Sequence, residues 1–170
     1  MGGRLLPPVS TLAAMTTEIS RDLNDYGFQT EVRVRLSETD AVGIVFFGSF
    51  ASFMDVGRMD YLGYLGFSPK EGRVPGLLPG AVVAQRGNFH APARYNDSLV
   101  IHVRMARIGN TSYTLHFLIV HKRTREVIST GALTLAWLDD DFRAVRVPEE
   151  FRSVIQAFEG DRLSGVSVRS

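Results

Sequence analysis

The sequence predicts an α+β domain in which an antiparallel sheet of about five strands packs on one long helix. One segment with helical spacing, residues 49–64, follows a single alternating segment and precedes four segments rich in β-branched and aromatic residues. Short links with turn-forming residues join the later segments, and no strand–helix–strand repeat separates them. Because such short links connect antiparallel neighbours, we expect an antiparallel sheet rather than a parallel one.

The length of 170 residues fits one compact domain. We expect an N-terminal extension at 1–28, the folded domain at 29–160 and a C-terminal tail at 161–170. No apolar run approaches the roughly 20 residues that span a bilayer, so no membrane span is expected. Pro7 and Pro8 interrupt the one stretch that resembles a signal sequence, so we expect a cytoplasmic protein.

Charge and composition exclude several classes of partner. The 19 basic and 18 acidic residues leave a net charge of +1, which offers no broad positive surface for a nucleic acid. The chain has no cysteine, so disulfides, thiolate nucleophiles and cysteine-based metal sites are excluded. The histidines show no ligand spacing with carboxylates, so we expect no metal and no separate cofactor. Each is typical of a strand residue whose ring is hydrogen-bonded: His90, His102, His116 and His121.

The first strand and the helix have different periods. From Thr30 onward, Val32, Val34 and Leu36 alternate with charged residues, which predicts a half-buried strand that ends at 37–40. From Ser49 to Tyr64 the apolar residues recur at helical spacing, which predicts the one long helix.

Beyond the helix, a loop and four strands are expected. Residues 66–80 contain four glycines and three prolines, which favour a surface loop, and loops of this length often cover sites. The strands are predicted at Ala81–Phe89, Ser98–Ile108, Thr111–His121 and Val127–Leu138. Gly109-Asn110 is a two-residue hairpin signal, and Pro148 with the acidic residues after it begins a short terminal helix.

Two separated stretches carry motifs of one family. Asp40-Ala-Val-Gly43-Ile-Val45 follows the first strand and leads through an aromatic-rich turn into the helix. Residues 88–97 read Asn-Phe-His-Ala-Pro-Ala-Arg-Tyr-Asn-Asp, with the spacing apolar-x-x-Pro-x-x-x-x-Asp. Both stretches resemble the hotdog-fold acyl-CoA thioesterases of the 4-hydroxybenzoyl-CoA thioesterase type, and the resemblance covers about residues 29 to 140.

The resemblance implies a sheet wrapped around the central helix and active sites that lie between subunits. It implies homodimers joined edge to edge, which many members pair into homotetramers. The implied reaction is hydrolysis of an acyl-CoA thioester to a free acid and CoA. Coenzyme A would then be part of the substrate rather than a cofactor.

The resemblance places Asp40 in the catalytic role, either as general base on water or as a nucleophile that forms a mixed anhydride. Backbone N–H groups of Phe47 and Gly48, near the helix N-terminus, are the candidate oxyanion donors. Taken alone, without the motif match, Asp40 is more typical of a turn residue than of a catalytic one. Asp55 on the helix is the competing carboxylate, although Arg58 three residues later is expected to pair with it.

The residues expected to contact substrate are Gly43, Val45, Phe46, Phe50, His90 and Arg107. Gly43 is expected there mainly for its backbone conformation. The phenylalanines favour an aromatic or short to medium acyl group. Further cations that we considered for the CoA phosphates are Arg86, Arg94, Lys122, Arg123 and Arg125.

Two other functions remain open on the same fold. A hydratase or dehydratase would carry a histidine a few residues after the aspartate, and residues 45–49 contain none. A non-catalytic acyl-CoA-binding domain would keep the groove and use Asp40 only in its turn.

Overall fold

The computed structural model describes residues 18–67, 80–139 and 141–163. The strands are β1 (Phe28–Arg33), β2 (Ala81–Phe89), β3 (Ser98–Ile108), β4 (Ser112–His121) and β5 (Val127–Ala136). The helices are α2 (Ser49–Tyr64), α3 (Glu149–Glu159) and the 3₁₀ turns η1 (Leu23–Asp25), η2 (Leu36–Glu38) and η3 (Gly160–Arg162). Most of the predicted loop at 66–80, and large parts of the predicted extension and tail, lie outside the described residues.

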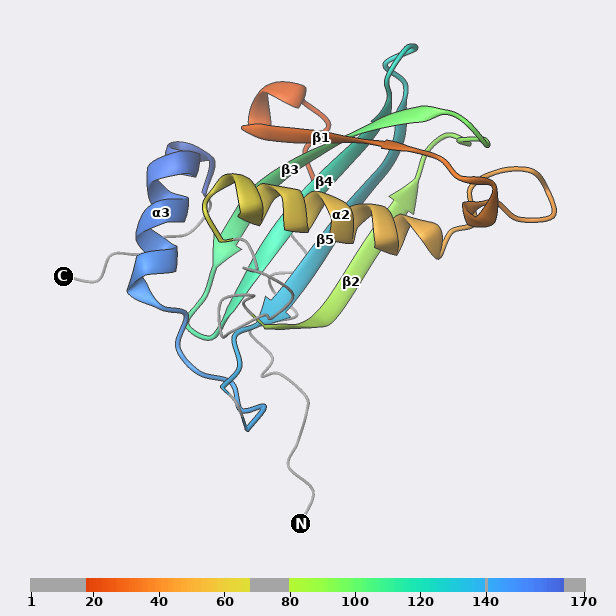
Figure 1. Cartoon of the computed structure of the whole chain (residues 1–170). Helices are drawn as coiled ribbons and strands as arrows, with labels where there is room; N and C mark the ends of the chain where they lie inside the picture. The colour runs from red at the N-terminus through yellow and green to blue at the C-terminus, as the bar shows by residue number, and fades with distance from the viewer. Residues whose placement is uncertain (1–17, 68–79, 140, 164–170) are drawn as a thin grey trace.

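The five strands form one sheet in the order β1-β3-β4-β5-β2, and every pair is antiparallel. Helix α2 crosses one face of this sheet, while α3 stands near the end of β3 (Figure 1). The antiparallel sheet and the order of one strand, one helix and four strands are confirmed. Among the described residues there are two α-helices, of 16 and 11 residues, and α2 is the one that lies across the sheet. Neither is long and apolar enough to cross a membrane.

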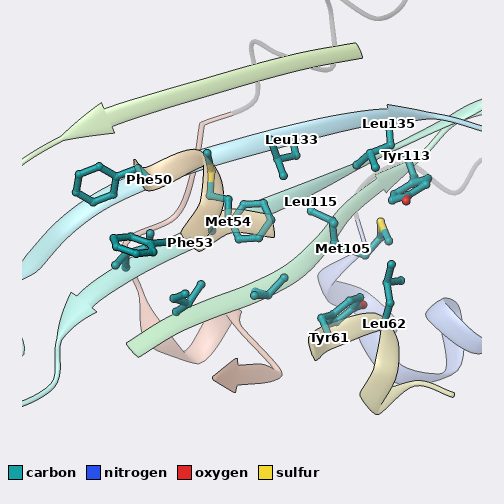
Figure 2. Close-up of a cluster of buried hydrophobic side chains, with 14 of the residues drawn as sticks. Phe50, Phe53, Met54, Tyr61, Leu62, Met105, Tyr113, Leu115, Leu133 and Leu135 are labelled. Atoms are coloured by element: carbon teal, nitrogen blue, oxygen red, sulfur yellow. The ribbon is translucent and has the colours of Figure 1, made fainter. Parts of the chain in front are cut away.

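The core lies between α2 and the sheet (Figure 2). The side chains of α2 that face the sheet are Phe50, Phe53, Met54, Tyr61 and Leu62, all at helical spacing. Gly57 shares this face, and a Cβ built on it would lie 2.8 Å from Cγ2 of Ile101 on β3. The missing side chain therefore lets the middle of α2 pack tightly on the central strands.

Three predicted boundaries were wrong, and the simplest is the end of β5, which lies at Ala136 instead of Leu138. The first strand was expected to reach Leu36, but β1 ends at Arg33, which pairs with Ser98, the first residue of β3. The ladder stops because its partner strand begins there, and Leu36 is 69% exposed. The link between β3 and β4 has three residues, 109–111, rather than two. The Gly109 N–H donates to the Ser112 carbonyl at 2.7 Å across the turn, and the carbonyl groups of the link accept hydrogen bonds from the N–H groups of Trp137 and Val147 and from the Arg152 side chain.

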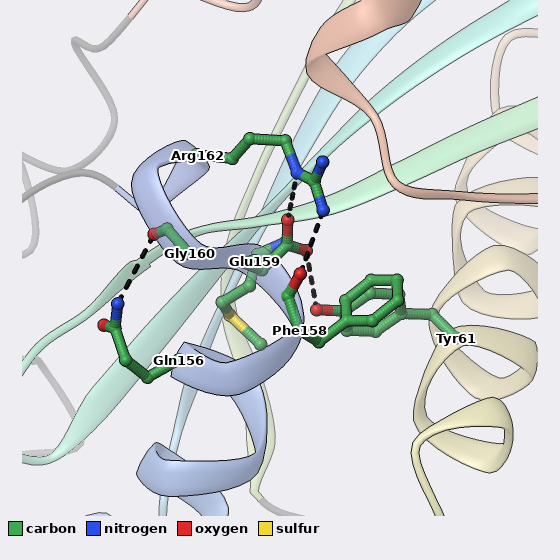
Figure 3. Close-up of polar contacts among 7 residues, drawn as sticks. Tyr61, Gln156, Phe158, Glu159, Gly160 and Arg162 are labelled. Carbon is green, nitrogen blue, oxygen red and sulfur yellow. Dashed lines mark hydrogen bonds and ion pairs between the residues drawn. The ribbon is translucent and has the colours of Figure 1, made fainter.

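The end of α3 is tied to the carboxyl-terminal half of α2 by a buried carboxylate (Figure 3). Glu159 accepts hydrogen bonds from the Tyr61 hydroxyl at 2.7 Å, the Met105 N–H at 2.8 Å and Arg162 Nε at 3.1 Å. Burial, and then the charge of Glu159, raise the pKa of Tyr61, so its hydroxyl stays a donor. This network fixes α2 against β3 at one end.

Candidate active site

Asp40 lies in a tight loop between η2 and α2. Thr39 and Val45 form an isolated antiparallel bridge across the loop. Inside it, the Asp40 N–H donates to the Ile44 carbonyl at 2.9 Å, and the Gly43 N–H donates to the Asp40 carbonyl at 3.0 Å. Gly43 has a φ of +83°, a conformation that favours glycine, so this residue shapes the loop.

The two oxygens of the Asp40 carboxylate have different surroundings. Oδ1 accepts the Val42 N–H at 2.9 Å and, at a longer 3.5 Å, the Ile44 N–H. These bonds are those of a turn-stabilising aspartate, the role that the sequence left open beside catalysis. Oδ2 has no hydrogen-bond donor among the described residues. One oxygen therefore holds the loop, and the other is available to a ligand.

Asp40 borders a pocket of about 450 Å³. Its lining is Asp40, Ile44, Val45, Phe47, Phe50 and the segment Phe89, His90, Ala91, Pro92 and Ala93. Apart from Asp40 and His90 these side chains are apolar. The rings of Phe50 and Phe89 pack at 5.0 Å between centroids, which joins the start of α2 to the end of β2.

His90 is the second polar side chain of the pocket. Its Nε2 lies 2.9 Å from Thr130 Oγ1, and its Nδ1 lies 3.2 Å from an Arg21 guanidinium nitrogen. Desolvation, and then the charge of Arg21, lower the pKa of His90. The neutral ring can thus accept a hydrogen bond from one partner and donate to the other.

The start of α2 supplies free donors beside the pocket. The N–H groups of Phe46 and Ser49 are bonded to the carbonyls of Glu38 and Phe46, each at 2.9 Å. Within the described part of the chain, the N–H groups of Phe47 and Gly48 have no acceptor. The first turn of α2 carries no acidic residue that would compensate the positive end of the helix dipole. An anionic oxygen would be stabilised there.

The structure brings together three of the six residues expected to contact substrate, and the other three lie outside the pocket lining. Val45, Phe50 and His90 line the pocket with Asp40 and Phe47. Two of the others lie outside the lining. Gly43 serves the loop backbone, and Phe46 is 44% exposed with its ring packed on Phe47 at 4.5 Å.

Arg107 lies far along β3 from the pocket, contrary to the prediction. Phe89 pairs with Ser129, Ser129 with Ile119, and Ile119 with Ile101, so Ile101 marks the level of the pocket on β3. Arg107 follows six residues later, which in a strand corresponds to about 20 Å. Because β3 runs away from the pocket, Arg107 does not reach Asp40 in the same chain.

Among the other cations considered for the CoA phosphates, the Lys122 side chain has an ion-pair partner within the chain. Lys122 pairs with Glu31 at 2.8 Å, and the Arg123 N–H donates to His121 Nδ1 at 3.2 Å. Arg125 has a φ of +62° in the same hairpin. Arg94 follows the pocket residue Ala93 directly.

The competing carboxylate pairs as expected. Arg58 Nη2 lies 2.6 Å from Asp55 Oδ1, and Arg58 Nε lies 3.0 Å from the same oxygen. The Asp55 side chain is 53% exposed and does not line the Asp40 pocket.

Two histidines contradict the expectation that each ring is hydrogen-bonded. His116 is fully buried, yet neither ring nitrogen has a partner in the described structure, and the same holds for His102 Nε2. Burial, followed by the charges of Arg104 and Arg86, lowers the pKa of His116 to about 4. Among the described residues, no three side chains of the metal-binding types lie close enough together to hold a metal ion.

Part of the pocket lining was not predicted from the sequence. Phe89, Ala91 and Pro92 line it, although only His90 was selected from that stretch. The signal was available, because the motif spacing already marked Phe89 and Pro92.

The arrangement of one long helix across a five-stranded antiparallel sheet is that of the hotdog fold. The family model described as Thioesterase superfamily matches residues 42–128, which are 87 of the 170 residues. The chain belongs to this superfamily and is a thioester hydrolase by class. The matched region begins two residues after Asp40.

Similar proteins agree with this assignment. The chloroplastic acyl-acyl carrier protein thioesterase ATL2 of Arabidopsis thaliana is 28% identical over 136 residues, which are 79% of this chain and 71% of the plant protein. A thioesterase of Thermus thermophilus, solved with coenzyme A and Zn, has a TM-score of 0.68 at 24% identity, covering 80% of this chain and 97% of that one. A 1,4-dihydroxy-2-naphthoyl-CoA thioesterase from Synechocystis has a TM-score of 0.66 at 17% identity, covering 75% and 94%. At these identities the two structures show a shared fold.

Proposed function

We propose that the chain hydrolyses an acyl-CoA thioester to a free acid and CoA, with Asp40 as its catalytic carboxylate. One observation carries the proposal: Asp40 and the start of α2 border the same pocket. A thioester carbonyl needs a base or nucleophile on one side and donors aimed at its oxygen on the other. The free Asp40 Oδ2 supplies the first, and the Phe47 and Gly48 N–H groups supply the second.

Two routes fit the carboxylate. As a general base, Asp40 would take a proton from water while the water oxygen attacks the carbonyl and the CoA thiolate leaves. As a nucleophile, it would form a mixed anhydride that water then opens. A single turnover in ¹⁸O-labelled water separates them, because the nucleophilic route allows the label to enter the Asp40 carboxylate.

The acyl group that we propose is aromatic or of short to medium length. The pocket volume of about 450 Å³ and the packed rings of Phe50 and Phe89 support this size and character. The Synechocystis neighbour, named for an aryl-CoA substrate, supports an aromatic group. The name of ATL2 makes an acyl carrier protein thioester the second substrate to test.

We further propose a homodimer or homotetramer in which the site is completed between subunits. Strand β2 is an edge strand of the sheet, and Val82 and Phe89 on it are 46% and 54% exposed. Pairing of two such edges would cover this surface. Light scattering that finds a stable monomer at micromolar concentration would contradict the shared site. The cytoplasmic location expected from the sequence stays a prediction.

The alternative is a non-catalytic acyl-CoA-binding domain. The hydrogen bonds of Asp40 Oδ1 within its own loop favour this second candidate, since a turn residue would make the same bonds. Measured release of free CoA from a panel of benzoyl-type and straight-chain acyl-CoAs decides between them. Turnover of any member supports the hydrolase, and binding without release supports the binding domain.

A further inference from the structure

Residues 19–26, which we call the strap, pack on the face of the sheet that points away from α2. Tyr26 is buried against Leu118 on β4. Successive residues of a strand point to opposite faces, and the neighbouring Phe117 belongs to the core under α2, so Leu118 lies on the other face. The Tyr26 hydroxyl donates to the Ser20 carbonyl at 2.7 Å, which joins the two ends of the strap.

The strap reaches the candidate active site through Arg21. A guanidinium nitrogen of Arg21 lies 3.2 Å from Nδ1 of His90, which lines the pocket of Asp40. The second ring nitrogen of His90, Nε2, lies 2.9 Å from Oγ1 of Thr130. Thr130 pairs in register with Leu118, so its side chain lies on the face that the strap covers. His90 is therefore the residue at which the strap meets the pocket.

The contact with Arg21 decides which ring nitrogen of His90 carries the proton. A guanidinium group has donors and no acceptor, so Nδ1 must be the unprotonated nitrogen that accepts. The proton of the neutral ring then lies on Nε2, which donates it to Thr130 Oγ1. A protonated ring has no acceptor nitrogen, so it would lose the Arg21 bond and be repelled by its charge. The geometry therefore opposes protonation, in agreement with the lowered pKa of His90.

The charge of His90 affects the pocket because Asp40 lines the same pocket. In the described structure, the charged groups placed around the His90 ring are Arg21 from the strap and Asp40 from the loop before α2, and the neighbours from β2 and β5, Phe89 and Thr130, are uncharged. An imidazolium in this pocket would attract the Asp40 carboxylate and occupy the oxygen that is available to a ligand. A neutral ring leaves this oxygen available.

We propose that Arg21 is a positioning residue of the candidate active site, which holds the His90 ring neutral with its proton on Nε2 so that the Asp40 carboxylate stays available to the thioester. The inference rests on the proposed thioesterase function. It extends the site to the strap, which lies outside residues 42–128 of the family match. Arg21 acts through His90 and takes no part in the chemical step.

Nitrogen-15 NMR of the His90 ring tests the contact in the full chain without any substrate. In the wild type, Nδ1 should have the chemical shift of an unprotonated nitrogen and Nε2 that of a protonated one. Arg21→Met removes the donor and the charge, so the pKa of His90 should rise toward its ordinary value of about 6.5 and both tautomers should appear. A proton on Nδ1 in the wild type, or a titration that Arg21→Met leaves unchanged, would overturn the assignment.

The pH profile of kcat/KM tests the consequence for the reaction. Relative to the wild type, Arg21→Met should lower kcat/KM by about fivefold to tenfold at pH 5.5, where a histidine of ordinary pKa is mostly protonated, and by less than about twofold at pH 8. Arg21→Lys keeps a charged donor and should keep the wild-type profile. An equal loss at both pH values would show a merely structural strap, and no loss at pH 5.5 would refute the role of Arg21.

The matched control is Arg143→Met. It removes an exposed arginine from the turn that follows β5, and it should change neither the His90 titration nor the pH profile. The same change in this control would refute a specific role of Arg21. If the wild type hydrolyses no thioester, the proposed function fails, and the role of Arg21 fails with it. Normal turnover with a pH profile that Arg21→Met leaves unaltered refutes the role of Arg21 alone.

Discussion

The two ends of α2 have opposite physical characters. At the amino-terminal end Phe47 is 66% exposed, and the N–H groups of Phe47 and Gly48 have no acceptor among the described residues. At the carboxyl-terminal end Tyr61 is fully buried and donates to the buried carboxylate of Glu159. Polar groups are left unsatisfied at one end and are fully used at the other. The same helix thus offers a ligand site at its amino-terminal end and is fixed by hydrogen bonds at its carboxyl-terminal end.

The difference follows from which segments meet each end. The start of α2 meets a loop whose residues are bonded mainly to one another, so its own amide groups are left over. The carboxyl-terminal end of α2 contacts α3 and β3, where Glu159 accepts three hydrogen bonds from three separate segments. A buried carboxylate is stable only when it is satisfied in this way. Substitutions at the two ends should therefore affect different measurements.

The largest effect is expected at the amino-terminal end. Asp40→Asn should lower the rate of thioester hydrolysis by at least about a hundredfold, the lower range for losing a positioned acid–base group. The amide keeps the size of the side chain and can still accept the Val42 N–H, so the loop and substrate binding should survive. Steady-state kinetics with a thiol-detecting reagent, together with a binding measurement, check this.

Asp55→Asn is the matched control for Asp40→Asn, because it removes a carboxylate that is paired at the surface with Arg58. We expect near-normal turnover from it. If Asp55→Asn abolished turnover while Asp40→Asn kept it, the catalytic role would belong to the helix and not to the loop.

At the carboxyl-terminal end the expected loss is in stability. Glu159→Ala removes the acceptor of Tyr61 and Met105 and leaves buried donors unsatisfied, which should cost about 3 kcal/mol in the free energy of unfolding. Turnover per folded molecule should change little. Urea denaturation measures the loss, with Glu149→Ala as the control on an exposed position of the same helix. Equal losses from both variants would contradict a special role for Glu159.

A pH titration of the free energy of unfolding tests the buried ring of His116 on β4. His116 stays neutral in the folded state down to a pKa of about 4, because burial and the charges of Arg104 and Arg86 oppose protonation. The unfolded chain takes up this proton near its ordinary pKa, so it binds more protons between these values and stability falls as pH falls. The expected loss between pH 7 and pH 5 is about 2 kcal/mol. His116→Leu should flatten this slope, and an unchanged slope would assign it to other groups.

The sequence predicted the elements better than the polar contacts between them. Helix Ser49–Tyr64 and strands Ala81–Phe89 and Ser98–Ile108 were predicted with their observed bounds, since each has a clear period and is flanked by turn-forming residues. The end of β1 was missed because it depends on where the partner strand begins, which is a tertiary fact. The Glu159 network was missed for the same reason, as its residues are up to 98 positions apart.

The candidate site could be predicted only in part. Asp40 and His90 were selected because a motif resemblance places both, and they do line one pocket. Arg107 was selected because it precedes a turn, and register along β3 carries it away from the pocket. The positive charge of an arginine does not indicate where its side chain lies relative to the pocket. The spacing of a motif, in contrast, also indicates the local geometry of its residues.

The smallest effects concern two glycines of α2, which test how tightly the helix joining its two ends is packed. Replacing glycine by alanine inside a helix gains up to about 1 kcal/mol from propensity. At Gly63 no atom lies within 4 Å of a built Cβ, so Gly63→Ala should stabilise the protein by about 0.5 kcal/mol.

At Gly57 the Cβ would lie 2.8 Å from Ile101 Cγ2 and 3.1 Å from Val103 Cγ2, and both side chains are stiff, β-branched and buried on a central strand. Overpacking there costs about 1–3 kcal/mol, so Gly57→Ala should be destabilising by about 1 kcal/mol despite its gain in propensity. Thermal unfolding of the pair gives the sign directly, and stabilisation by both would mean that α2 is free to move away from β3.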